Sequence, residues 1–309
     1  MKKKNFSSVC ILLNYKKHFS KVLFFFFILY SASLFAQQED LLQLVEKDTP
    51  KKEFIKNAFK STRVINGHSM EFLSAGTMDF RILHRFGFVN EGFKEFFGLD
   101  QASMRMGFDF GLTNNLMLGV GRSTFKKELD GFIKYAPVRQ SKGPESFPLT
   151  IALVSGITMN TMEWEDPQRK NFFSSRLAYY FQTIIGRKFN EKLSFQLSPT
   201  MVHTNLVPLA NNSNDVYALG LGGRFKLSKR MALTLDYSYV INPLFPETHQ
   251  DPLAVGIDIE TGGHVFQLHF SNSTGMNERA LINETTGNFT KGDIRFGFNL
   301  SRVFQLRKK

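Results

Sequence analysis

The sequence predicts an all-β protein: a closed antiparallel transmembrane β-barrel of about 12 strands, within bounds of about 10 to 14. Three observations carry this prediction: an export signal at the N-terminus, side chains that alternate in polarity from Thr77 onward, and connections that alternate in length. A short N-terminal periplasmic helical segment is expected before the barrel.

The first 36 residues have the composition of a secretory signal peptide. They contain six lysines and no acidic residue, and an apolar run over 22–35 ends in small residues before Gln37. That run is too short to span about 30 Å of hydrocarbon as a helix. We therefore expect cleavage after Ala36 and delivery to the outer membrane of a Gram-negative bacterium.

Removal of this segment changes what the composition indicates. The formal net charge of +12 falls to 33 basic against 27 acidic side chains, and the only cysteine, Cys10, is lost. Disulfides, thiol nucleophiles and cysteine-bound metals are then excluded. A basic tip remains at 305–309, but no basic cluster is interleaved with aromatic residues, so nucleic acid is not an expected partner.

From Thr77 onward the side chains follow the period of two that is typical of β-strands. In 102–112, for example, methionine, phenylalanine and leucine alternate with serine, arginine, glycine and aspartate. Runs of this length suit a tilted passage through a bilayer. We expect strands over 77–86, 102–112, 116–125, 130–139, 148–158, 175–187, 192–203, 215–227, 231–241, 252–260, 264–272 and 292–304.

The lengths of the connections support the same fold. If the N-terminus is periplasmic, connections should alternate between long outer loops and short inner turns. None of the inner ones exceeds eight residues, and five of the six outer ones have ten or more. Strand 252–260 is needed for this parity, and it also makes the strand number even.

Residues 37–76 form a separate periplasmic segment before the barrel at 77–304. Pro50 follows a helix-start signal, and Phe54, Ile55, Ala58 and Phe59 form i,i+4 apolar pairs. These features predict a short amphipathic helix over about 50–60. Whether the rest of the segment extends the first strand or plugs the lumen stays open.

Several motifs are similar to those of a known family. They are Thr-Arg-Val-Ile-Asn-Gly-His-Ser at 62–69, Asp-Phe-Arg-Ile-Leu-His-Arg-Phe-Gly at 79–87 and Phe-Gly-Leu-Asp at 97–100. Gly-Arg-Ser at 121–123, Ser-Asn-Ser at 271–273 and Gly-Phe-Asn-Leu-Ser-Arg at 297–302 fit the same pattern. The chain resembles, over about 60–305, the uncharacterised Bacteroidota β-barrel family catalogued as domain of unknown function 5777. The resemblance implies an outer-membrane barrel and brings no activity, substrate or catalytic residue.

The face expected to point inward carries charges of both signs. The candidate lumen network is Asp79, Arg81, Arg85, Arg105, Asp109, Arg176, Arg224, Asp236, Asp258, Glu260 and Arg295. Closure would place 292–304 beside 77–86, so Arg295 could join the charges of the first two strands in one ladder. The ladder is either a salt-bridge network that fills the bore or a ligand site in which arginine binds carboxylate or phosphate. A slight excess of arginine would favour anionic solutes.

The signals for catalysis and for metals are weak. His269 and Ser271 share the inward face of one strand, with Asp258 or Glu260 on the adjoining strand, but no nucleophile motif accompanies them. The histidines are too scattered to predict a metal site. We expect no enzyme and no cofactor.

The sequence therefore predicts a monomeric barrel in outer-membrane lipid that acts as a narrow channel or ligand-binding transporter for small polar solutes. The alternative is a non-transporting scaffold, whose outer loops at 159–174, with Trp164, and at 273–291 dock a protein or surface partner. A barrel hydrolase is a third reading.

Overall fold

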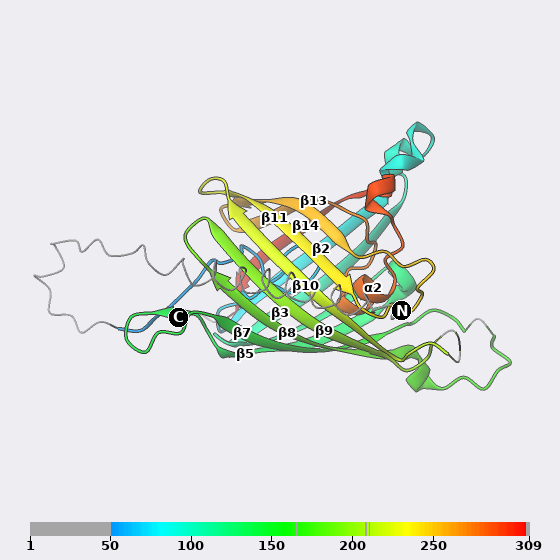
Figure 1. Ribbon diagram of the computed structural model, residues 1–309, viewed down its shortest axis with the longest axis horizontal. Helices are drawn as coiled ribbons and strands as arrows, with labels where there is room; N and C mark the ends of the chain where they lie inside the picture. The colour runs from blue at the N-terminus through cyan, green and yellow to red at the C-terminus, as the bar shows by residue number, and fades with distance from the viewer. Residues whose placement is uncertain (1–50, 165, 208, 210, 307–309) are drawn as a thin grey trace, which may run out of the picture. The chain divides into compact units, whose positions relative to one another are not determined.

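Twelve antiparallel strands close into a barrel in the computed structural model, which describes residues 51–164, 166–207, 209 and 211–306 (Figure 1). Each barrel strand pairs with the next along the chain, and the last pairs with the first. The strands are β2 (Thr77–Phe88), β3 (Ala102–Thr113), β4 (Leu116–Ser123), β5 (Leu129–Val138), β7 (Thr150–Met159), β8 (Leu177–Lys188), β9 (Leu193–Thr204), β10 (Asp215–Lys226), β11 (Met231–Val240), β12 (Leu253–Thr261), β13 (His264–Ser271) and β14 (Arg295–Gln305).

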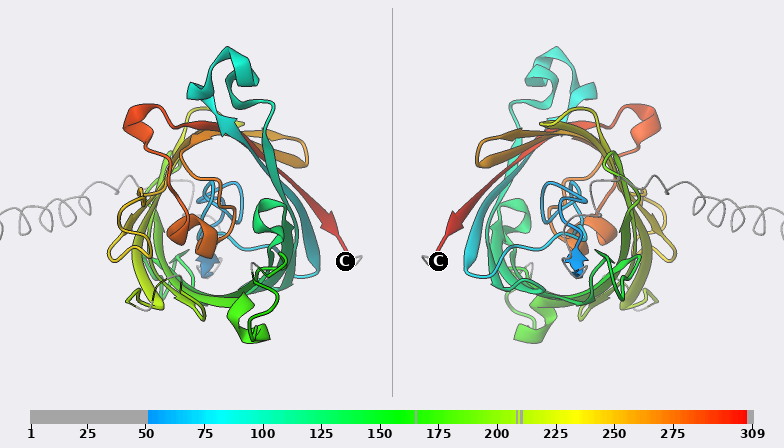
Figure 2. Two further views of the ribbon diagram at one scale, coloured as in Figure 1. Left: turned by 90° about the vertical axis from the view of Figure 1, so that its right-hand side faces the viewer. Right: turned by 90° about the vertical axis from the view of Figure 1, so that its left-hand side faces the viewer.

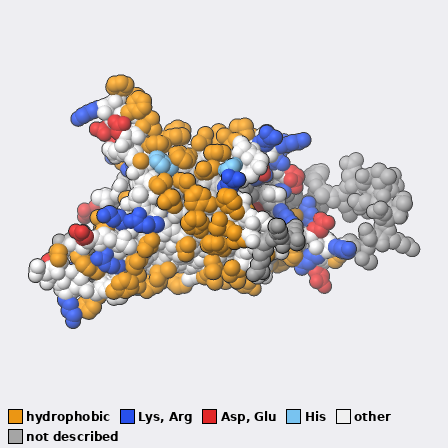
Figure 3. All heavy atoms as spheres, turned by 180° about the vertical axis from the view of Figure 1, so that it is seen from behind, with side chains coloured by type: hydrophobic (Ala, Val, Ile, Leu, Met, Phe, Trp, Pro, Cys, Tyr) orange, Lys and Arg blue, Asp and Glu red, His pale blue; other side chains and the backbone are white. Residues whose placement is uncertain are grey.

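The predicted closed antiparallel barrel is confirmed, and each strand boundary lies within three residues of its predicted position. Alternation explains why the prediction works, because successive side chains point to opposite faces of a strand. Phe181 is exposed while Gln182 is buried, and Leu235 is exposed while Asp236 is buried. The outward residues form the apolar surface of the barrel wall in Figure 3.

The connections contain only short elements. One α-helix, α2 (Glu278–Asn283), lies between β13 and β14, and the described chain has no helix long and apolar enough to cross a membrane. The connections also contain the short 3-10 segments η2 (Val89–Glu91), η3 (Phe93–Gly98), η4 (Phe125–Lys127), η5 (Phe173–Arg176) and η6 (Phe289–Lys291).

The helix predicted over about 50–60 is wrong for its described part, 51–60. Glu53–Phe54 forms strand β1, which pairs with β6 (Ser141–Lys142) outside the barrel sheet. Asn57 has a φ of 59°, in the left-handed region, so a right-handed α-helix cannot continue through this residue. Ala58 and Phe59 do not line a helix face. They are buried in the lumen, where they pack in an apolar cluster with side chains of the barrel wall.

The open question about this segment is answered by its position. Residues 56–73, called the plug from here on, enter the barrel, and α2 enters it from the connection between β13 and β14 (Figure 2). The predicted signal peptide at 1–36 and the residues up to 50 lie outside the described part of the chain.

Candidate functional site: the occupied lumen

The plug folds into a small β-hairpin inside the barrel. Arg63 and His68 are paired through their main chains in an isolated antiparallel β-bridge. The Val64 amide donates to the Gly67 carbonyl at 2.9 Å, and the Ser69 amide donates to the Thr62 carbonyl at 3.0 Å. Most of this hairpin is buried, so its polar main-chain groups must find partners within the protein.

The hairpin tip is bound by a wall carboxylate. Oδ2 of Asp236, on β11, accepts hydrogen bonds from the amides of Ile65 (3.2 Å), Asn66 (2.7 Å) and Gly67 (2.9 Å). Consecutive amides that point at one carboxylate form a nest, and bonds to a charged acceptor are among the stronger hydrogen bonds. Asp236 was predicted to face the lumen, and its role there is to hold the plug.

Other wall side chains bind the rest of the hairpin backbone. Gln267 on β13 donates to the Val64 carbonyl at 2.7 Å, and Asn299 on β14 donates to the Ile65 carbonyl at 2.8 Å. Two further wall residues contact the second arm of the hairpin. Gln196 accepts from the Met70 amide (2.8 Å) and donates to the His68 carbonyl (2.7 Å). Lys134 donates to the carbonyls of Ser69 (2.6 Å) and Glu71 (2.7 Å).

Part of the predicted charge ladder forms. Arg81 bonds to Asp79 at 2.6 Å and lies 3.8 Å from Asp109. It also donates to the hydroxyls of Ser61 (3.0 Å) and Thr62 (2.6 Å) in the plug. At this place the charges fill the lumen and bind the plug at the same time.

Arg105 has a partner that the sequence analysis missed. Its guanidinium forms a two-pronged pair with Asp130 on β5, at 2.8 and 2.5 Å. The guanidinium lies against Gly107 and Gly121, and a Cβ at position 121 would come within 2.3 Å of it. The inward parity of β5 is the signal that could have identified Asp130, and Lys134 with it.

The remaining predicted network residues inside the barrel also bond to the plug or to the wall. Arg85 donates to Asn299 (2.9 Å) and to Asn66 of the plug (2.8 Å). Three more contacts complete this group: Arg224 to the Ala58 carbonyl (3.3 Å), Gln267 to Asp258 (3.0 Å), and an ion pair between Lys60 and Glu260.

Arg295 and Arg176 do not join the network, which corrects that part of the prediction. Arg295 stacks over the Phe88 ring at 3.6 Å, next to a register shift in the β14–β2 ladder. Arg176 lies in η5, where it stacks over Trp164 at 3.9 Å. Both residues lie at strand ends, where the inward–outward alternation no longer sets the direction of a side chain.

His269 and Ser271 are buried, but they do not form a catalytic pair. His269 Nδ1 lies 3.2 Å from the carbonyl of Gln267, and Ser271 accepts from the Ser273 amide at 3.1 Å. No hydrogen bond joins the two side chains within the described chain, and Asp258 and Glu260 bond elsewhere. The geometry gives the hydrolase reading no support.

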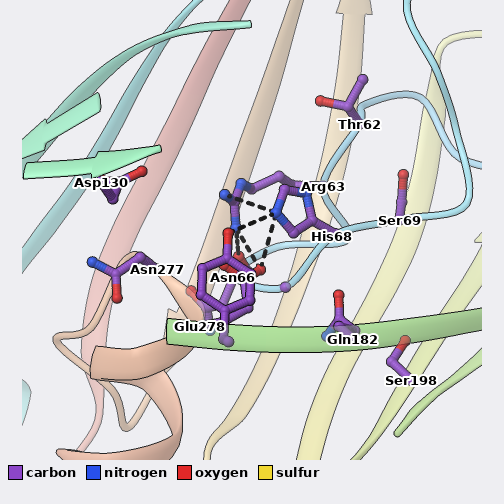
Figure 4. A network of polar contacts seen from close by, with 12 residues as sticks. Thr62, Arg63, Asn66, His68, Ser69, Asp130, Gln182, Ser198, Asn277 and Glu278 are labelled. Atoms are coloured by element: carbon purple, nitrogen blue, oxygen red, sulfur yellow. Dashed lines mark hydrogen bonds and ion pairs between the residues drawn. The ribbon is translucent and has the colours of Figure 1, made fainter. Parts of the chain in front are cut away.

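The plug and α2 meet in a buried polar cluster that the sequence did not reveal (Figure 4). Arg63 forms an ion pair with Glu278 of α2 at 2.9 Å, and both side chains are 1% exposed. His68 Nε2 lies 3.5 Å from Arg63 Nη2, 3.5 Å from Glu278 Oε1 and 3.4 Å from the Tyr180 hydroxyl. The N-terminal segment and the β13–β14 connection are therefore linked directly inside the barrel.

Acidification is expected to loosen the plug through His68. Burial, and next the charge of Arg63, lower the pKa of His68 well below its usual value near 6.5. A released plug would take up a proton near pH 6.5 while the inserted one would not, so the inserted state loses stability as pH falls from 7 to 5. Hydrogen exchange of 62–71, corrected for intrinsic rates, should show this loss in the wild type and much less of it in His68→Gln. An equal pH dependence in both proteins would contradict this role of His68.

The plug and α2 leave little free space beside the wall of β8–β11. A cavity of about 20 Å³ with a mixed polar and apolar lining lies there, lined in part by His68, Gln182, Asp236 and Glu278. That volume suits about one water molecule. In this cavity, a solute larger than water would need the plug or α2 to move.

The buried charges are nearly balanced. Among the described residues six cationic and seven anionic side chains are buried. They are Arg63, Arg81, Arg85, Arg105, Lys134 and Arg224 against Asp79, Asp109, Glu128, Asp130, Asp236, Asp258 and Glu278. The excess of arginine that favoured anionic solutes is offset by Glu128, Asp130 and Glu278.

Comparisons with known proteins find one matching family and several solved structures with some likeness to this chain. A family described as a membrane-bound β-barrel domain, DUF5777, matches residues 59–304. No curated protein has a significant sequence match to the chain. Among solved structures, the NanC porin has 8% identity and a TM-score of 0.46, over 73% of this chain and 98% of its own. The KdgM porin has 9% identity and a TM-score of 0.44, over 74% of this chain and 99% of its own. An outer-membrane channel from Pseudomonas putida F1 has 13% identity and a TM-score of 0.46, over 76% of this chain and 98% of its own.

Proposed function

Since the chain belongs to the DUF5777 family of membrane-bound β-barrel domains, we propose that it is a gated outer-membrane channel for small polar solutes. In this proposal it is a monomer, exported from a bacterium of the Bacteroidota by the signal at 1–36. The observation that carries the proposal is that a separate segment, and not the side chains of the barrel wall alone, fills a polar lumen.

The wall is shaped to leave room for the plug. Cβ atoms placed at Gly222 and Gly256 would lie 2.9 Å from Val64 and 3.3 Å from Ile65, and one at Gly186 would meet Met70 at 2.5 Å. A twelve-stranded barrel encloses more space than the eight-stranded barrels that side chains alone fill. Without the plug, its lumen would be lined by glycines and polar side chains and by apolar ones such as Val154 and Ile184.

The contacts that hold the described plug in place are non-covalent. The hydrogen bonds and ion pairs named above hold it, and the chain joins it to β2 only beyond residue 73. Such a segment can act as a gate, because its contacts can be exchanged for contacts with water.

Conductance in planar bilayers tests the proposal with two variants. Lys134→Met removes both bonds to the carbonyls of Ser69 and Glu71, so we expect it to raise the open probability about tenfold or more over the wild type. The pair Val64→Cys and Gly222→Cys should lock the plug, since a Cβ at 222 lies within disulfide reach of the Val64 side chain. Oxidation should close this channel and reductant should reopen it.

The controls for this experiment are the two single-cysteine variants, which should not respond to oxidant. If folded wild type and folded Lys134→Met both show no conductance and no solute uptake, the channel is rejected. Conductance that the oxidised cysteine pair leaves unchanged would reject the plug as its gate.

A scaffold is the second candidate, and exposed aromatic residues favour it. Phe93 in η3 is 80% exposed and Phe173 in η5 is 66% exposed. Of the two loops expected to dock a partner, 273–291 folds inward through α2, which leaves 159–174 as the docking candidate. Deletion of 162–172 should abolish co-purification of a partner while the barrel keeps its heat-modifiable migration. Absence of any partner that depends on this loop would remove the scaffold.

A further inference from the structure

The lumen wall forms more hydrogen bonds with the main chain of the plug than with its side chains. Main-chain hydrogen bonds are also what proteins use to bind extended peptides. We propose that the lumen is a binding site for peptides in a β-hairpin conformation, and that the plug occupies this site as an intramolecular ligand. The inference goes beyond conduction, because a hairpin can bind in the lumen whether or not solutes pass.

The first part of the site recognises amide groups. Asp236 accepts three consecutive main-chain amides at the hairpin tip, at 2.7 to 3.2 Å. Any peptide with a tight two-residue turn can present such amides, whatever its side chains. Gln196 accepts a hydrogen bond from a fourth main-chain amide, that of Met70, at 2.8 Å.

The second part recognises carbonyl groups. Donors from four different strands reach five carbonyls of the plug between residues 64 and 71. The main chain of the wall is engaged in the barrel ladder, so these donors are all side chains. Main-chain hydrogen bonds give affinity in peptide recognition, and pockets for particular side chains give specificity.

Side chains of the plug also contact the wall: Phe59, Met70 and Leu73, for example, pack in an apolar cluster with wall residues. Arg63 pairs with Glu278, and the hydroxyls of Ser61 and Thr62 accept from Arg81. The side chains of Val64 and Ile65 pack over wall glycines. The expected ligand is therefore a hairpin with a two-residue turn, a basic residue two positions before it, and apolar residues in the chain on either side.

A buried plug with a purely structural role would also need its backbone groups bonded. The two roles differ in one respect: a binding site accepts the same backbone from another molecule. The test must therefore exchange the plug for a peptide from solution in an otherwise intact protein.

For this test a protease site is inserted after Ala75, in the exposed chain between the plug and β2. The full-length folded barrel is then cleaved in detergent and mixed with labelled peptides. The first peptide has the sequence of 56–73. The second is a hairpin that keeps the residues at 63 and 67 and apolar side chains at 58, 59, 64, 65, 70 and 73, with its other positions changed. The third is the first peptide N-methylated at positions 66 and 67.

Binding by fluorescence anisotropy should rank the peptides by their backbones. We expect the second peptide to bind within about tenfold of the first, and the third to bind at least about tenfold more weakly, since two bonds to a carboxylate are lost. Asp236→Asn should weaken the binding of the first two peptides by a similar factor. Asp251→Asn is the matched control, because Asp251 accepts from Tyr237 and the Val240 amide and does not touch the plug.

Three results would overturn the proposal. If only the peptide with the native sequence binds, the site recognises side chains. If the N-methylated peptide binds as well as the native one, the backbone contacts do not provide the affinity. If no peptide enters a cleaved barrel that keeps its heat-modifiable migration, the plug is a fixed part of the fold.

Discussion

Arg105→Met should lower the free energy of unfolding of the barrel by about 3–5 kcal/mol, because removing one partner leaves a buried charge without compensation. Arg105 and Asp130 are both buried, and they bond through two oxygens at 2.8 and 2.5 Å. Methionine fills a similar volume but leaves the carboxylate of Asp130 without its cation. Urea unfolding in lipid vesicles, followed by circular dichroism, measures the change.

A double variant separates the lost charge balance from the lost packing. Arg105→Met with Asp130→Leu should recover most of the stability, since replacing a whole buried pair with apolar groups is often neutral. Arg176→Met, at an arginine outside the network, should change stability by less than about 1 kcal/mol. If Arg105→Met is no more destabilising than Arg176→Met, the Arg105–Asp130 pair contributes nothing to the barrel.

The fold could be predicted because a lipid-facing barrel imposes two independent patterns on its sequence. One is the alternation of side chains, as in β2 and β10, and the other is the parity of long and short connections. Strand β12 shows their combined value, since both its alternating side chains and the parity of the connections require it. The exact end of a strand depends on local pairing, which is why predicted boundaries differ by up to three residues.

The charged wall could be predicted only where alternation holds. Asp79, Arg81, Asp109 and Asp236 face inward as their parity predicts. Arg295 has inward parity too, but the register shift between Arg295 and Gly297 in β14 removes the alternation there. A register shift arises from pairing between strands, which a pattern along one strand does not encode.

The residues that fill the lumen could not be predicted, because they lie outside the strands. Nothing in the periodicity of residues 56–73 or of α2 says whether a connection folds into the barrel or away from it. Arg63, His68 and Glu278 are single charged or polar residues outside the barrel strands, and exposure to solvent is the usual outcome for such side chains. Their burial depends on contacts between segments 215 positions apart, as in the Arg63–Glu278 pair.

Because that pair joins the plug to α2, Glu278→Gln should release both segments together. Glu278 provides the carboxylate that pairs with Arg63, and glutamine keeps the shape of the side chain without its charge. Breaking a buried pair in this way costs about 3 kcal/mol or more. Amide hydrogen exchange should therefore become roughly 100-fold faster in 62–71 and in 278–284.

Glu284→Gln is the matched control for this change. Glu284 lies just after α2 and pairs with Arg279 at 2.6 Å and with Lys126 at 2.8 Å, away from the plug. Its substitution should speed exchange in 278–284 and leave 62–71 unchanged. If Glu278→Gln also leaves 62–71 unchanged, Asp236 and Lys134 hold the plug without help from α2, and movement of the β13–β14 connection would not open the lumen.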